Sequence, residues 1–267
     1  MNDRTLPIPP RPDLAGRPQP VLRSPRRAPV AVITVLALLG SILGGLVIVW
    51  VEMPDSEGSY RFIGEAAGAP IRWNPCEPVR YEVNLANAPE GALAVVHEAF
   101  DRTAEVTGIE FRFEGTTTRT PEEQADDYFL SHLTDPVVWL PVLVAWLPRE
   151  EFRAQFERLG SDRHALAVAN SIRGELETAD QYTSGAIVVD AEARMSDDFD
   201  GRYSLGMVMM HEAGHLMGLG HVKDPAEVMF SDRSTYPQPI EEWGPGDTEG
   251  LQRLGTGGCM DPVPVAP

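Results

Sequence analysis

Apolar residues recur at helical spacing within residues 92–107. Leu93, Val96, Phe100 and Ala104 stand three or four positions apart, which is the period of one face of an α-helix. We therefore predict an amphipathic helix over this stretch, packed on the rest of the fold through that face.

Two short stretches are apolar without any alternation. Residues 142–146 and 186–189 are bounded by turn residues, and runs as short and continuous as these are typical of strands buried on both faces. Strands separated by long connections, followed by helices, predict an α+β fold, a mixed α/β sandwich built on one sheet.

The longest apolar run, residues 28–51, contains 24 residues without a charge. A bilayer's hydrocarbon core needs about 20 apolar residues in a helix, and Trp50 stands at one end, where an interfacial aromatic is expected. A cleaved signal peptide would have a shorter core of about 7 to 15 residues. We predict a single transmembrane helix at residues 28–51.

Basic residues predict how this helix is oriented. Six arginines lie before the span, five of them within about 20 residues of it, whereas Arg61 is the first basic residue after it, and positive charge stays on the cytoplasmic side. We expect a single-pass protein of the cell membrane with a disordered, Pro/Arg-rich cytoplasmic tail at residues 1–27. Outside the cytoplasm we expect a stalk at residues 52–70, a folded domain at 71–262 and a short tail at 263–267.

Charge is distributed unevenly along the chain. The whole sequence has a net charge of −18, and residues 1–53 carry six arginines against three acidic residues, a balance of +3 that leaves −21 for the remainder. So acidic a surface repels phosphate, which argues against nucleic acid as a partner.

Candidate chemistry is concentrated in residues 211–221, which read H-E-A-G-H-L-M-G-L-G-H. On a helix, His211 and His215 project from one face about 6 Å apart along the axis, so both can bind one metal ion. His221 would lie roughly 15 Å along a continuing helix, out of reach. We therefore expect the helix to end at Gly218, since glycine adopts the left-handed cap conformation, and His221 to fold back as third ligand.

Glu212 follows the first of these histidines. Three neutral nitrogen ligands leave a zinc ion its full charge and one open position, which lowers the pKa of a bound water. A carboxylate beside the metal is placed to take the proton from that water. The pattern predicts hydrolysis of an amide by a zinc-activated water, with Glu212 as general base.

Met229 stands eight residues after His221 in an apolar turn. A histidine segment of this form followed by a methionine turn resembles the metzincin peptidases, and the eight-residue interval resembles that of the matrixins, the matrix metalloprotease group. The resemblance implies one catalytic Zn²⁺, a peptide or protein substrate, and a fold with one twisted sheet, a long active-site helix and a C-terminal helix. It extends more weakly over about residues 71–256, including a first strand at residues 79–83 and a last helix at 246–255.

Two further stretches each leave two interpretations open. Residues 164–172 resemble the family's edge strand, on which a peptide pairs in extended form, but an ordinary inner strand fits equally well. An acidic stretch before the zinc helix either holds Ca²⁺ or is a solvated loop, and we favour the solvated loop. The stretch contains Asp190, Glu192, Asp197, Asp198 and Asp200.

Cys76 precedes the first strand of the resemblance and Cys259 follows its last helix. An oxidising compartment favours a disulfide between them, which would tie the ends of the domain together. The alternative makes Cys76 a thiolate that blocks the zinc, but the latch motif P-R-C-G of the matrixins is missing.

Two functions of different classes remain after this reading. The first is a membrane-tethered zinc endopeptidase acting outside the cytoplasm, or a related enzyme that hydrolyses another amide, as in a cell-wall peptide. The second is a zinc-stabilised module that binds extracytoplasmic peptides or cell-wall polymer without turnover. Glu212 favours the enzyme, because a binding module has no need of a base beside its metal.

Overall fold

The computed structural model describes residues 59–66, 68–131, 139–156, 165–172, 181–199, 204–231 and 241–260. All of them lie in one compact unit of the chain, Leu46–Pro267. The predicted cytoplasmic tail and transmembrane segment, residues 1–51, lie outside the described residues, and so does the C-terminal tail. Within the described part, no helix is long and apolar enough to cross a membrane.

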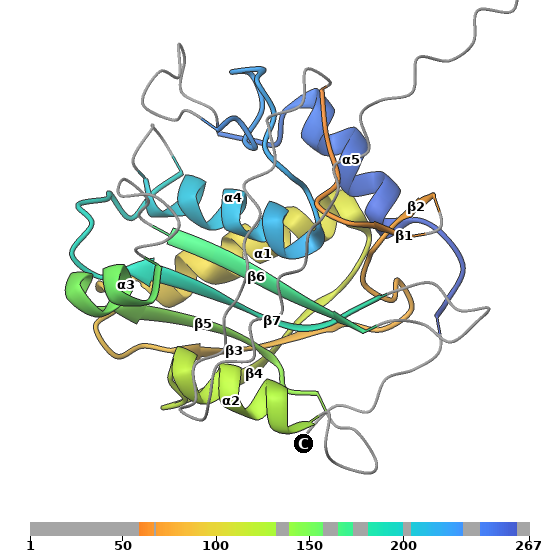
Figure 1. Ribbon diagram of the computed structural model, residues 1–267. Coiled ribbons are helices and arrows are strands. Elements are labelled where there is room, and N and C mark those ends of the chain that lie inside the picture. The colour runs from red at the N-terminus through yellow and green to blue at the C-terminus, as the bar shows by residue number, and fades with distance from the viewer. Residues whose placement is uncertain are drawn as a thin grey trace, which may run out of the picture. The chain divides into compact units, whose positions relative to one another are not determined.

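A five-stranded sheet forms the centre of the fold, in the order β4-β3-β5-β7-β6 (Figure 1). The first four strands in this order run parallel, and β6 pairs antiparallel with β7 at the edge. Its strands are β3 (Val79–Asn84), β4 (Phe111–Thr116), β5 (Val142–Leu147), β6 (Ala165–Ile172) and β7 (Gln181–Asp190). A separate two-stranded sheet pairs β1 (Glu65–Ala66) with β2 (Ala69–Pro70).

The central strands are buried on both faces, as their apolar runs predicted. All six residues of β5 are buried, and so are nine of the ten in β7. Parallel strands covered by helices on both sides have this character, because neither face meets water. Among the described strands β6 lies at the edge of the sheet, which favours the edge-strand interpretation of residues 164–172.

Helix α1 (Ala92–Thr107) confirms the predicted amphipathic helix. Its buried face is rotated from the expected one, because Val95 and Ala99 are buried with Val96 and Phe100, whereas Leu93 is only partly covered. Glycines in the left-handed conformation stand at both ends of the helix.

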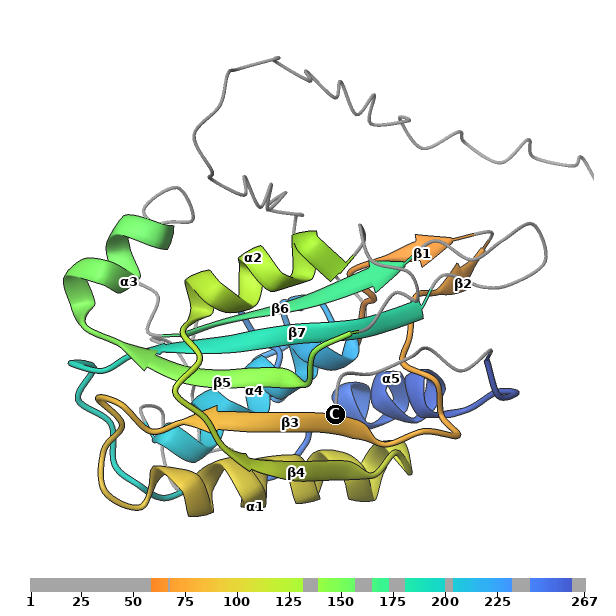
Figure 2. The ribbon, with the colours of Figure 1, turned by 90° about the horizontal axis from the view of Figure 1, so that it is seen from below.

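Helices α1, α4 (Leu205–Met217) and α5 (Pro245–Gly255) pack on one another, with α1 and α4 covering one face of the sheet. Figures 1 and 2 show α2 (Pro121–Ser131) on the opposite face. Alternation along β7 explains this arrangement: a Cβ at Gly185 would meet Leu216 of α4, whereas the neighbouring Ser184 accepts a hydrogen bond from Gln124 of α2.

Helices α2 and α3 (Arg149–Phe156) were not predicted. The local signal for α2 is a capping box, in which the Glu123 N–H donates to the Thr120 hydroxyl and the Thr120 N–H donates to the Glu123 carboxylate. Gln124 then fixes α2 on the sheet by donating to the carbonyls of Pro141 and Gly185.

A disulfide joins Cys76 to Cys259, with an S–S distance of 2.01 Å and a Cα–Cα distance of 5.3 Å. It links the segment before β3 to the segment after α5. Asn74 reinforces the same junction, because its side chain donates to the Met260 carbonyl and accepts from the Met260 N–H. With its sulfur in this bond, Cys76 is not a thiolate available to a metal.

The N-terminal described residues already belong to the folded unit. Phe62 packs against the hydrophobic core and forms a bridge with Leu219, and Tyr60 contacts Phe62. Part of the segment predicted as a stalk, residues 52–70, therefore packs on the domain that we expected to begin at residue 71.

Candidate metal centre

Helix α4 carries the first two candidate ligands, and all 13 of its residues are buried. Ser204 caps its N-terminus by accepting a hydrogen bond from the Met207 N–H. At the other end Gly218 has φ 114°, and its N–H reaches back to the carbonyls of Gly214 and His215. The helix thus ends at the predicted glycine. Its backbone has the left-handed conformation, which residues other than glycine rarely adopt.

The turn after Gly218 brings His221 back to the helix. Its Nε2 lies 3.2 Å from Nε2 of His211 and 3.1 Å from Nε2 of His215. Two nitrogens bound to one zinc at tetrahedral geometry are about 3.4 Å apart, given zinc–nitrogen distances near 2.1 Å. Within the described part of the chain, this is the one group of three ligand side chains close enough to share an ion.

Backbone carbonyls fix the tautomers of the two helix histidines. His211 Nδ1 lies 2.7 Å from the Val228 carbonyl oxygen, and His215 Nδ1 lies 2.8 Å from that of Leu219. A carbonyl only accepts, so each Nδ1 donates a proton, and in the neutral ring Nε2 then carries a lone pair.

The Nε2 lone pairs of His211 and His215 converge with His221 Nε2. A proton on His221 Nε2 could form a hydrogen bond to at most one of the two lone pairs. A cation between the three nitrogens satisfies all of them, so the residues present fit a metal ion. Such donated Nδ1–H bonds are also the usual outer support of histidine ligands.

Glu212 lies next to His211 on α4 and is 4% exposed. A buried carboxylate next in sequence to one of three converging histidines is an arrangement suited to proton transfer.

Met229 packs against helix α4 at Gly214, a glycine that the sequence alone did not single out. A Cβ at Gly214 would collide with the Met229 Sδ and come within 3.3 Å of Trp243. The methionine turn also supplies Val228, whose carbonyl orients His211. The turn therefore supports the metal site from below through one packing contact and one hydrogen bond.

Two buried carboxyl groups hold this turn against α5. Asp247 accepts hydrogen bonds from the N–H groups of Val228 and Met229, and Glu227 accepts from those of Gly246 and Asp247. Burial, and then the charge of Glu227, raises the pKa of Asp247 to about 8. Neither residue was singled out from sequence, since only the fold brings them together.

The acidic stretch before α4 has local partners of its own. Asp190 forms an ion pair with Arg149 at 2.8 Å and accepts from the Glu192 N–H, and Asp198 accepts from the Ser196 hydroxyl at 2.7 Å. Asp200 lies outside the described residues. The solvated loop therefore stays the favoured prediction for this stretch, and calcium binding stays its untested alternative.

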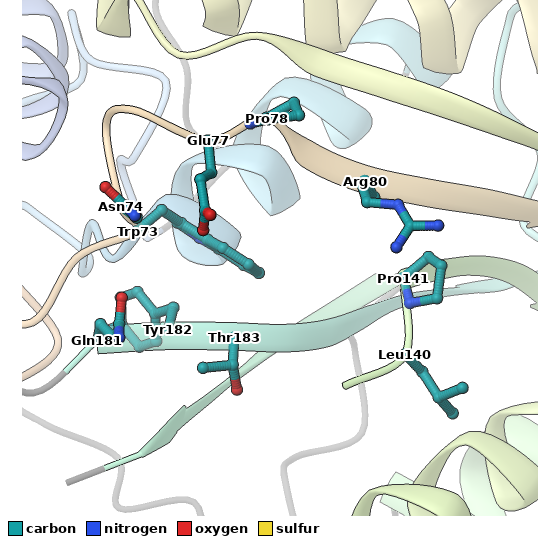
Figure 3. A pocket seen from close by; sticks show the side chains of 10 residues that line it. All are labelled: Trp73, Asn74, Glu77, Pro78, Arg80, Leu140, Pro141, Gln181, Tyr182 and Thr183. Carbon is teal, nitrogen blue, oxygen red and sulfur yellow. The ribbon is translucent and has the colours of Figure 1, made fainter. Parts of the chain in front are cut away.

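A separate cavity of about 30 Å³ lies where β3, β5 and β7 begin, lined by residues that include Trp73, Arg80 and Thr183 (Figure 3). This volume is far below the roughly 300 Å³ or more of a typical ligand-binding pocket. None of the three histidines lines it, so it is not the candidate metal centre.

Comparison with known protein families agrees with the motif. Residues 155–255 match the family model of the matrixins, a stretch that includes the three histidines, Glu212 and Met229. The chain is also similar to the crystal structure of metalloproteinase-II from Bacteroides fragilis, with 12% identity and a TM-score of 0.36. That similarity covers 73% of this chain and 57% of the other. No curated protein matches the sequence. Residues 155–255, the stretch that carries the metal centre, are therefore similar to the matrixins.

Proposed function

We propose that this protein is a membrane-tethered, zinc-dependent endopeptidase that hydrolyses peptide bonds outside the cytoplasm. The observation that carries the proposal is the convergence of the Nε2 atoms of His211, His215 and His221 beside the buried Glu212. The matrixin match over residues 155–255 supports the peptidase class.

Zinc is the metal that best suits this donor set. Catalytic zinc sites use three protein ligands, often histidines, and keep one position open, whereas calcium and magnesium prefer oxygen ligands. When bound, Zn²⁺ would supply a Lewis acid that polarises the scissile carbonyl and lowers the pKa of a water molecule.

Within this proposal, the protein's own groups have distinct tasks. His211 and His215 hold their rings in place through the Val228 and Leu219 carbonyls, so their Nε2 lone pairs are already oriented before an ion arrives. Glu212 accepts the proton of the attacking water and passes it to the leaving amine, which makes it the general base and then the general acid.

An extended peptide is the substrate shape that the sheet favours. Among the described strands, β6 lies at the edge of the sheet and pairs with β7 alone. Helix α4 packs directly on β6, so a peptide added to the outer edge would run beside the helix that carries the candidate ligands. We propose that substrates bind by this strand addition.

Peptide hydrolysis is tested with the full-length chain in detergent and a mixed peptide library. We expect endoproteolytic cleavage that a chelator abolishes and added Zn²⁺ restores. If the protein binds Zn²⁺ and peptides but cleaves none, the endopeptidase proposal fails and the zinc-stabilised binding module replaces it.

Membrane tethering rests on the charge-free residues 28–51 and the arginines before them. A reporter fused to the N-terminus should be cytoplasmic, and one fused to the C-terminus should be accessible to protease added outside intact cells. Protection of the C-terminal reporter in intact cells would overturn the proposed topology.

A further inference from the structure

The segment at residues 61–63 runs antiparallel beside the turn that carries the third candidate ligand. The Ile63 N–H donates to the Gly218 carbonyl and the Gly220 N–H donates to the Arg61 carbonyl, both at 2.8 Å. These two bonds frame the bridge between Phe62 and Leu219. Residues about 155 positions apart in the chain are thereby joined at one edge of the metal centre.

The other edge of the same turn faces the metal site. The Leu219 carbonyl accepts the Nδ1–H of His215 at 2.8 Å, and the Leu219 N–H donates to the Gly214 carbonyl at 2.8 Å. The turn around Leu219 is therefore hydrogen-bonded on two sides. On one side the Leu219 carbonyl orients His215, and on the other side Gly218 and Gly220 pair with residues 61–63.

This turn has little of its own to keep it rigid. Two of the three residues at 218–220 are glycines, which lose more conformational freedom on ordering than any other residue. Leu219 contributes the one side chain of the three, and it is fully buried. Pairing with an external backbone segment therefore adds a constraint on the Leu219 carbonyl to those of the end of α4 and the buried Leu219 side chain.

Residues 61–63 can provide this constraint because they are fixed on the other side by α5. A Cβ at Gly250 would lie 3.0 Å from the Tyr60 Cβ, so the absence of a side chain there admits Tyr60. The Arg253 guanidinium lies 5.2 Å from the centroid of the Tyr60 ring, a cation–π contact. Figure 1 shows this N-terminal segment, in orange, running beside α5.

We propose that residues 61–63 are a positioning segment for the metal centre: their pairing with residues 218–220 holds the Leu219 carbonyl that orients His215. The inference rests on the proposed function, since it takes His215 as a metal ligand. It adds a part of the chain that lies about 150 residues before the histidine motif.

The decisive variant is Ile63→Pro in the full-length protein, because proline lacks the N–H that donates to Gly218. Ile63→Ala is the matched control, since it shortens the same side chain and keeps the N–H. The readouts are the rate of Zn²⁺ release to a chelator and the visible absorption spectrum of the Co²⁺-substituted protein, which reports the ligand geometry directly.

We expect Ile63→Pro to release Zn²⁺ about 10-fold faster than Ile63→Ala and to have an altered Co²⁺ spectrum, as loss of an outer support of a histidine ligand typically costs 10- to 100-fold in affinity. Equal release rates and identical spectra in the two variants would overturn the inference. If Ile63→Pro does not fold, Tyr60→Ala decides in the same way, because it loosens the segment on α5 while keeping every N–H.

The wild-type protein separates this inference from the proposed function. If wild type holds neither Zn²⁺ nor Co²⁺, the metal centre itself is wrong, and with it the basis of the positioning segment. If wild type binds zinc and cleaves peptides while all variants behave alike, only the positioning segment is wrong.

Discussion

Gly214 is the residue on which the packing beneath the metal centre depends. It lies in α4 immediately before His215, where a Cβ would overlap the Met229 sulfur and press on Trp243. We predict that Gly214→Ala lowers the free energy of unfolding by about 1 to 3 kcal/mol, the usual cost of overpacking a dense core.

Denaturant unfolding of Gly214→Ala measures this cost. Gly258→Ala is the control, because a Cβ there meets nothing within 4 Å and should change stability little. Equal stabilities of the two variants would mean that Met229 moves aside freely and does not support α4.

Residue identity and spacing predicted which side chains gather at the metal centre, but not what orients them. The four-residue interval of His211 and His215, and a helix end at Gly218, follow from helix geometry alone. The carbonyls of Val228 and Leu219 carry no sequence signal, since every residue has a carbonyl and only the folded chain decides where it points. The same holds for Asp247, which reaches Val228 across 19 positions.

At the scale of elements, the carboxyl pair Glu227 and Asp247 joins the methionine turn to the start of α5 and makes this junction sensitive to pH. The pKa of Asp247 is raised to about 8 by burial and by Glu227, so the folded state holds a proton that the unfolded chain releases near pH 4. This contribution to stability is complete below about pH 4 and is lost as pH rises through about 8.

We therefore predict that thermal stability declines between about pH 5 and 8, by at most about 1.4 kcal/mol per pH unit from this group. Glu227→Gln removes the neighbouring charge and should flatten the decline. Melting temperatures of both proteins across this range measure it. An identical slope in the variant would exclude coupling between the two carboxyl groups.

Apolar periodicity predicted the elements that are buried through their own apolar residues. It missed the elements held in place by a polar contact with a residue far away in the sequence. The span of α1 and the buried strands β5 and β7 follow from apolar spacing and from continuous apolar runs. Helix α2 is held on the far face of the sheet by the polar side chain of Gln124, so an apolar pattern does not mark it. The capping box of Thr120 and Glu123 is the local signal for its start. The rotated face of α1 reflects its contacts with α4 and α5, which no local pattern encodes.

At the scale of the whole molecule, the disulfide between Cys76 and Cys259 closes a loop over 183 positions and ties both ends of the domain together. Removing a native disulfide typically costs about 2 to 5 kcal/mol. We predict that reduction lowers the free energy of unfolding by this amount while the metal centre keeps its zinc, because neither cysteine belongs to the histidine cluster.

Denaturant unfolding with and without a reductant measures the effect of the disulfide. The double variant Cys76→Ser, Cys259→Ser should match the reduced wild type and be insensitive to the reductant. Stability that does not change on reduction would show that the bond contributes nothing to this fold.

Turnover by Glu212→Gln, with its zinc content measured in the same sample, tests the account most directly. The amide is nearly isosteric with the carboxylate, so the packing of α4 and the three histidines stay as they are, but it cannot accept the proton of the attacking water. We predict a loss of about 10² to 10⁴ in kcat/KM with zinc content and melting temperature unchanged. Peptide cleavage at a rate comparable to wild type, with the same zinc content, would contradict the role of Glu212 as base.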